Sequence, residues 1–430
     1  MPAHHKLRIN GTMPAPARSG ADREDGRVPH GMSLPASAAR RAPRVWAMLG
    51  HKAGDNSQVL ALAEALGLPF EEKHFVYRPY ELVTNLLLGP TLAGVVTEKS
   101  SALAAPWPDL IISAGRRNEP ICRWIQKQAA PQRVRLVHVG RPWAKIERFD
   151  LIVTTPQYRL PIRPNVLHNR TPLHRITPDR LRRDAEAWAP RLDGLPEPHV
   201  AVMIGGNSGP FSFDRAAGER LARQASELAN ARGGSLLVST SARTQPPAID
   251  AFMQALSAPA HVYRWTPGDP ENPYFAFLGL ADEIIVTGDS MSMLAEACAT
   301  HKRVYIFDLG EGRYAMRESV AADARREKRA GPWWQGFEKA RFDAFWYRQM
   351  MRFGPQRLSR DIRIVHRHLV DSGLAVWLGD AFPKDEPLPS LDCVPRAVAR
   401  VRALLDDGAF TNGAGEDTGE DEGFLWRKSA

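Results

Sequence analysis

The stretch that decides the fold is HVAVMIGGNSGP at residues 199–210, which an amphipathic segment at 214–232 follows. Its first six residues form an apolar run typical of a buried strand, and the glycines after it predict a tight loop that leads into a helix. The stretch VWAMLGHKAGD at residues 45–55 has the same order of features, with helical apolar spacing at 56–66. A strand, a glycine loop and a helix in this order open a βαβ unit, so the chain contains two such openings.

Further short apolar runs follow each opening, and helical patterns separate most of them. We expect strands at 73–77, 110–113, 134–139 and 151–153 in the first half, and at 235–239, 261–265, 283–287 and 303–307 in the second, with helices at 119–128 and 178–188. The predicted fold class is α/β, with two Rossmann-like domains in the GT-B arrangement and mostly parallel sheets. In such sheets ligands bind beyond the carboxyl ends of the strands, so we expect a ligand in the cleft between the two halves.

Changes in composition along the chain suggest domain boundaries. Residues 1–43 are rich in Arg, Pro and Gly and contain no apolar segment like that of a secretory signal. Asp22, Glu24 and Asp25 argue against a mitochondrial transit peptide. The expected parts are a disordered extension (1–43), an acceptor domain (44–160), a proline-rich linker (161–198), a donor domain (199–345), closing helices (346–405) and a disordered acidic tail (406–430).

Charge and cysteine content limit the possible partners and compartment. The 430 residues have a formal net charge of +9, which favours anionic partners, and the three cysteines stand far apart, as expected in a reducing compartment. No apolar run approaches the roughly 20 residues of a spanning helix, so we expect a cytoplasmic protein. The basic and aromatic segment at 313–367 suits peripheral contact with an anionic membrane, such as the inner face of the cell membrane; a closing helix packed on the first half is the alternative. No nucleic-acid module is recognisable.

The glycine loop at 205–210 is the first candidate binding site. Glycines allow close approach of a ligand to the backbone, and the N-terminus of the following helix would attract a phosphate. The alternative is a tight turn without a ligand. The loop lacks the GxGxxG pattern, and the next strand leads into Ser239–Ser241 without an acidic residue, which disfavours NAD. The donor contacts expected here are Gly205, Gly206, Asn207, Ser208 and Gly209.

The second candidate site, TGDSMSMLAEA at residues 287–297, joins a strand to a helix through a small polar turn. Its hydroxyl and N–H groups could hold a diphosphate, and a carboxylate two helical turns on could accept hydrogen bonds from a ribose. An ordinary helix cap with a solvated glutamate is the alternative. The candidate donor contacts are Gly288, Asp289, Ser290, Ser292 and Glu296, together with Arg243 after the strand at 235–239.

Candidates for catalysis and acceptor binding lie in the first half. His51 and Asp55 occupy the first loop, and either could act as the base that deprotonates an acceptor hydroxyl; Asp55 could instead cap the helix after it. Cationic and polar residues after the next strands could bind phosphate, with solvated surface arginines as the alternative. These acceptor or phosphate candidates are Arg116, Arg117, Asn118 and Arg141.

Together these motifs resemble the mitochondrial-fission ("elongated mitochondria") family of bacteria and plants, over about residues 44–380. The resemblance rests on the loops at 205–211 and 288–296, with support from 50–56 and 113–117. That family is similar to GT-B glycosyltransferases. More remotely, the two loops of the second half resemble the donor site of the peptidoglycan N-acetylglucosaminyltransferase, which implies diphosphate contacts at both loops and ribose contacts at Glu296. Asp289 departs from the neutral residue expected beside a diphosphate.

The function we expect is a metal-independent transferase without a cofactor, which moves a sugar from a nucleotide donor, uridine-linked, to a hydroxyl on a lipid or surface glycan. A GT-B epimerase would share the donor loops and stays open as an alternative. The resemblance also leaves open a non-catalytic membrane adaptor, because plant members of the family are linked to recruitment of the fission dynamin.

Overall fold

The computed structural model describes residues 41–79, 89–209, 211–312, 315–321, 360–382, 389 and 391–406. Residues 1–40 of the predicted N-terminal extension lie outside them. So do residues 313, 314 and 322–359 of the basic and aromatic segment, and the tail from 407. Both sheets belong to one unit of the chain, Pro43–Ala430. Within the described residues, no helix is long and apolar enough to cross a membrane.

The first sheet has six parallel strands in the order β2-β1-β3-β4-β5-β6. Strand β1, between β2 and β3, is fully buried: Val45, Ala47 and Leu49 contribute to the core on one face, and Trp46 and Met48 to the core on the other. Successive side chains of a strand point to opposite faces of the sheet, so this alternation shows that the sheet is covered on both faces. The bounds are β1 Val45–Leu49, β2 Phe70–His74, β3 Leu110–Ala114, β4 Arg135–Val139, β5 Leu151–Thr154 and β6 Val166–His168.

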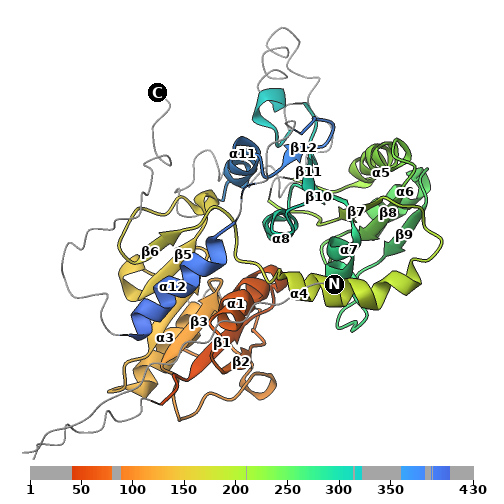
Figure 1. Cartoon of the computed structure of the whole chain (residues 1–430). Helices are drawn as coiled ribbons and strands as arrows, with labels where there is room; N and C mark the ends of the chain where they lie inside the picture. Colours follow the sequence, from red (N-terminus) through yellow and green to blue (C-terminus); the bar gives the residue numbers. More distant parts are fainter. Residues whose placement is uncertain are drawn as a thin grey trace, which may run out of the picture. The chain divides into compact units, whose positions relative to one another are not determined.

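Helices from both ends of the chain cover the first sheet. Helices α1 (Ala53–Ala65) and α12 (Cys393–Leu405) contribute to one core, and α3 (Glu119–Ala129) contributes to the other. Figure 1 shows α12, drawn in blue, beside α1 and the strands of this sheet. The closing helices predicted at 346–405 thus include one that returns to the first half.

The second sheet is also six-stranded and parallel, in the order β12-β11-β10-β7-β8-β9. One continuous core surrounds it. The bounds are β7 His199–Met203, β8 Ser235–Ser239, β9 Ala260–Tyr263, β10 Glu283–Thr287, β11 Arg303–Phe307 and β12 Val376–Trp377, with helices α5 Arg215–Asn230, α6 Pro246–Ala255, α7 Tyr274–Leu280, α8 Met291–Cys298 and α11 Arg363–Asp371. Two doubly wound parallel sheets in one chain confirm the predicted fold class.

Several local predictions differ from the structure, among them the following. The segment 161–198 contains the predicted helix α4 (Pro178–Trp188), but it also contains β6, which pairs with β5. The prolines around β6 concealed it, since they suit an edge strand as well as a linker. Helix α1 begins at Ala53, three residues before its predicted start, and within it the Asn56 side chain bonds the N–H and C=O of Gly50. Tyr77 forms only an isolated bridge with Val95, outside β2.

Candidate functional site

The two glycine loops of the second half lie side by side because of the strand order. The chain runs from β7 outward to β8 and β9, then returns to place β10 on the other side of β7. The loops after β7 and β10 therefore flank the point where the strand order reverses, which is the usual ligand position in doubly wound sheets. The two segments are in direct contact, since the N–H of Gly205 donates to Oγ1 of Thr287 at 2.8 Å.

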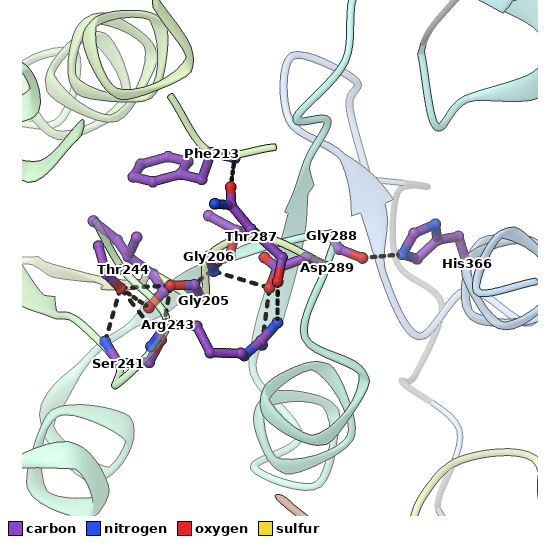
Figure 2. Close-up of polar contacts among 12 residues, drawn as sticks. Gly205, Gly206, Phe213, Ser241, Arg243, Thr244, Thr287, Gly288, Asp289 and His366 are labelled. Carbon is purple, nitrogen blue, oxygen red and sulfur yellow. Dashed lines mark hydrogen bonds and ion pairs between the residues drawn. The ribbon is translucent and has the colours of Figure 1, made fainter. Parts of the chain in front are cut away.

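The Gly205 loop is held in place by hydroxyl groups from the loop after β8. The carbonyl of Gly205 accepts hydrogen bonds from Ser241 Oγ at 2.7 Å and from Thr244 Oγ1. Figure 2 shows both side chains against this carbonyl. The last residue of β10 and the loop after β8 therefore hold the loop after β7 in place.

Asp289 lies in the middle of this arrangement and is almost fully buried. Its Oδ2 accepts a hydrogen bond from the N–H of Gly206 at 2.9 Å and forms an ion pair with Nη2 of Arg243, also at 2.9 Å. Nη1 of Arg243 donates to the carbonyl of Asn207 at 3.2 Å. Burial raises the pKa of the Asp289 carboxyl, and Arg243 acts in the opposite direction.

Two different contacts explain the adjacent glycines at positions 205 and 206. A Cβ on Gly205 would overlap the carboxyl oxygens of Asp289, and a Cβ on Gly206 would overlap the backbone carbonyl of Arg243. The predicted close approach at these glycines is real, but the approaching groups belong to the chain itself. The N-terminus of α5, predicted to face a phosphate, is also occupied, since Oδ1 of Asp214 accepts from the N–H of Ala217 at 3.0 Å.

The rest of the loop is a self-contained turn. Oδ1 of Asn207 accepts from the N–H of Phe213 at 2.9 Å, and Ser208 and Phe211 exchange backbone hydrogen bonds of 3.0 and 3.1 Å. Gly209 has a φ of 57°, in the left-handed region that favours glycine. The turn therefore satisfies many of its own polar groups.

The second glycine, Gly288, has a packing role. Its N–H donates to the carbonyl of Phe307 at 2.9 Å, and its carbonyl accepts from Nε2 of His366 at 2.6 Å. A Cβ would lie 2.8 Å from the sulfur of Met316. His366 is buried, and burial lowers its pKa to about 4, so the ring is neutral at pH 7.

Helix α8 begins directly after this turn, with Ser290 as its N-cap residue. The Ser290 side chain makes no capping hydrogen bond, so the ordinary cap proposed as the alternative is not formed by this side chain. Further along α8, Glu296 is buried: its Oε2 accepts from the Tyr274 hydroxyl at 2.5 Å and its Oε1 from Ser57 Oγ at 3.3 Å. Burial raises the pKa of Glu296, and that of Tyr274 is well above its usual value.

The two base candidates of the first half stand at the start of α1. Asp55 lies in the first turn, and its Oδ2 is close to Gly115, where a Cβ would come within 3.0 Å of it. Its side chain is not the N-cap, because the helix starts at Ala53 after Lys52. His51 is exposed, with Nη1 of Arg117 3.2 Å from both ring nitrogens. A guanidinium can only donate hydrogen bonds, so this contact favours a ring nitrogen without a proton.

The four acceptor candidates differ in their surroundings. Arg116 stacks on Trp143, with its guanidinium carbon 4.5 Å from the ring centroid. Arg141 donates to the carbonyl of Tyr158 and is partly buried, which lowers its pKa. Asn118 is buried, and its amide donates to Met48 and Ala114, which ties β1 to β3. The predicted acceptor role of Asn118 is therefore replaced by a structural one.

A cavity of about 1580 Å³ is lined by loops that follow strands of both sheets. Gly205, Gly206, Gly288, Arg117 and Asn118 are outside its lining. The predicted residues that line it are His51, Asp55, Arg116, Arg141, Asn207, Ser208, Gly209, Arg243, Asp289, Ser290, Ser292 and Glu296.

Other residues of this lining were not predicted from the sequence. Tyr274 does not follow a predicted strand and belongs to no recognisable motif. Nothing in the sequence therefore indicates that it is the partner of Glu296. Trp143 could have been found, because it follows β4 in the same loop as Arg141. Ser57 belongs to the helical stretch after the first loop, and its sequence position indicates only a helix residue.

Comparison with solved structures gives low scores. A UDP-glucosyltransferase from Polygonum tinctorium has a TM-score of 0.42 and 10% identity over 86% of this chain and 100% of that one. A UDP-GlcNAc 2-epimerase from Neisseria meningitidis, solved with UDP-GlcNAc, has a TM-score of 0.39 and 11% identity over 85% and 100%.

Sequence comparison finds relatives with higher sequence identity than these solved structures. The mitochondrial fission protein ELM1 of Arabidopsis thaliana is 27% identical over 257 residues, which are 54% of this chain and 59% of that protein. An uncharacterized protein of Rickettsia prowazekii is 23% identical over 301 residues, 61% of this chain and 82% of that one. The match thus spans 59% of the length of the plant relative. The family model described as mitochondrial fission ELM1 matches residues 53–347, more than half of the chain, and the chain therefore belongs to that family.

Proposed function

We propose that this protein is a glycosyltransferase that moves a sugar from a nucleotide-diphosphate donor to a hydroxyl acceptor. The observation that carries the proposal is the pairing of the loops after β7 and β10 at the switch point of the second sheet, in the lining of one large cavity. Doubly wound sheets bind nucleotides at this position.

The first turn of α8 is the place we propose for the diphosphate. Ser290 and Ser292 line the cavity there, and the helix dipole favours an anion at its N-terminus. The Gly205 loop, in contrast, already uses the N–H groups of Gly205 and Gly206 for bonds to Thr287 and Asp289.

Glu296 is the residue we propose for the ribose of a uridine nucleotide. It lies on α8 after the proposed phosphate position and lines the cavity. A carboxylate oxygen can accept more than one hydrogen bond, so ribose hydroxyls can bind beside those of Tyr274 and Ser57.

The transfer itself needs a base for the acceptor hydroxyl and cations for the departing diphosphate. His51 and Asp55 line the cavity and can accept a proton, and Arg116 and Arg141 line it as cations. We propose an acceptor on a lipid or a surface glycan, and no metal or cofactor in the reaction. The rival function, which the resemblance to this family leaves open, is a membrane adaptor without catalysis.

The base assignment is tested by turnover. Nucleotide sugars are first screened by thermal shift, and turnover of the selected donor is then measured for His51→Ala and Asp55→Ala. Loss of the general base reduces turnover by roughly 10²–10⁴, and the variant of the other residue keeps most of its activity. His74→Ala, an exposed histidine outside the cavity lining, serves as the control. Near-normal turnover in both test variants places the base elsewhere, and no turnover of any donor by the unmodified protein favours the adaptor.

A further inference from the structure

The carboxylate of Asp289 occupies the position that an anionic ligand would take at the Gly205 loop. Its Oδ2 receives the N–H of Gly206 and the guanidinium of Arg243, each at 2.9 Å. A backbone N–H from a glycine loop together with an arginine is the donor set that binds a phosphate oxygen. Figure 2 shows these donors converging on the Asp289 side chain.

A phosphate cannot join this arrangement without cost. The Gly206 N–H and the near side of Arg243 are already engaged, and the Gly205 N–H is bonded to Thr287. A phosphate placed against the carboxyl oxygens of Asp289, at the N–H of Gly206 and the guanidinium of Arg243, would also be repelled by the carboxylate, and burial strengthens such repulsion because little water screens it. The side chain has little room to withdraw, since its carboxyl group lies directly against Gly205.

Asp289 is nonetheless one of the residues that line the cavity, with its carboxylate buried in the cavity wall. Its other carboxyl oxygen, Oδ1, has no hydrogen-bond partner among the described residues. Glu283 also has a buried carboxylate oxygen without a partner, so it is the position in the cavity wall that distinguishes Asp289. Its charge therefore acts on whatever enters the cavity at this point.

We propose that Asp289 is a specificity-determining residue that keeps phosphate away from Gly206 and Arg243, so that the anionic part of a ligand must bind elsewhere in the cavity. This inference rests on the proposed function for its ligand class, a nucleoside diphosphate. It predicts that removing the charge of Asp289 strengthens anion binding, whereas loss of an ordinary ligand-binding residue weakens it.

The experiment measures binding of two probes, inorganic pyrophosphate and UDP, to the full chain by calorimetry. Asp289→Asn keeps the shape and the Gly206 acceptor while it removes the charge. We expect this variant to bind pyrophosphate at least about tenfold more tightly than the unmodified protein, which corresponds to about 1.4 kcal/mol. Adding Arg243→Gln to the same chain should remove the gain.

Glu283→Gln is the matched control. Glu283 is also buried and paired with arginine, with Oε1 2.6 Å from Arg232, but it lies at the opposite end of β10. We expect unchanged pyrophosphate affinity in this variant. If Asp289→Asn does not unfold cooperatively, Asp289→Ser replaces it with the same expectation.

The outcomes separate this inference from the proposed function. Unchanged, weaker or absent pyrophosphate binding by the folded neutral variants overturns the inference, whatever UDP does. A gain for pyrophosphate while UDP binds no better than pyrophosphate supports the inference and contradicts nucleotide binding. Tight UDP binding by the unmodified protein without a gain in Asp289→Asn supports the nucleotide site and rejects the role of Asp289.

Discussion

His366 connects the second glycine loop to α11 through one buried hydrogen bond. Its Nε2 donates to the carbonyl of Gly288, and its ring packs edge-on against Trp377 with 5.4 Å between centroids. Since burial lowers the pKa of His366 to about 4, a proton would bind the unfolded chain more readily than the folded one between pH 4 and 6.5. The free energy of unfolding therefore gains a contribution above pH 6.5 that is lost as the pH falls toward 4.

We predict that His366→Gln reduces the pH dependence of stability. Glutamine can still donate to Gly288, but it takes up no proton in this range. Between pH 7 and pH 4 the unmodified protein should lose up to about 3 kcal/mol more free energy of unfolding than the variant. Urea unfolding at several pH values measures the difference, with the exposed His74→Gln as control. Parallel curves for the unmodified protein and His366→Gln would show that His366 has no such role.

Gly205 and Gly206 show what could and could not be read from the sequence at this scale. Adjacent glycines after a strand indicated a close approach to the backbone, which the structure has. The sequence could not identify the approaching group, because Asp289 is 83 residues from Gly206 and reaches it only through the strand order of the sheet. Long-range pairing of this kind leaves no local pattern.

Among the elements, α12 is the one whose position was hardest to predict. Its sequence shows helical apolar spacing, but nothing in it indicates that the buried residues pack on α1 and the first sheet. The side-chain amide of Asn169, just after β6, donates to the carbonyl of Cys393 at 3.0 Å and fixes the start of the helix. The end of the described chain therefore stabilises the first half.

We predict that Leu404→Ala destabilises the protein by about 2–5 kcal/mol, because it leaves a cavity in the core between α12 and the first sheet. Ala399→Ser on the exposed side of α12 should change the free energy of unfolding by no more than about 0.5 kcal/mol. Chemical unfolding of both variants makes the comparison. A small effect of Leu404→Ala would mean that α12 contributes little to the first half in solution.

Most strands were predictable because buried parallel strands are short apolar runs between turn residues. The predicted bounds of β8, β10 and β11 match the structure, and so do those of α4. Strands β6 and β12 were missed, since they have three and two residues and too little apolar sequence to form a pattern. Edge strands of this length form by pairing with a neighbouring strand, as β6 does with β5 and β12 with β11.

At the scale of the whole molecule, the two sheets have different strand orders, but both are doubly wound. Each has a point where the order reverses, after β1 and β3 in the first sheet and after β7 and β10 in the second. The predicted base, acceptor and donor candidates follow these four strands, apart from Arg141 after β4 and Arg243 after β8. The position of the cavity could thus be predicted, whereas bonds within its lining, such as that of Tyr274 with Glu296, could not.

The central claim is that the second half binds a uridine nucleotide with Glu296 on the ribose, and calorimetric titration of UDP onto the full chain tests it most directly. We predict saturable binding by the unmodified protein and a loss of about 1–3 kcal/mol in Glu296→Ala, the size of a lost hydrogen bond to a charged group. Glu283→Gln, which removes a buried carboxylate far from the loops, should leave the affinity unchanged. Absence of UDP binding, or equal affinity in Glu296→Ala and the unmodified protein, would contradict the account.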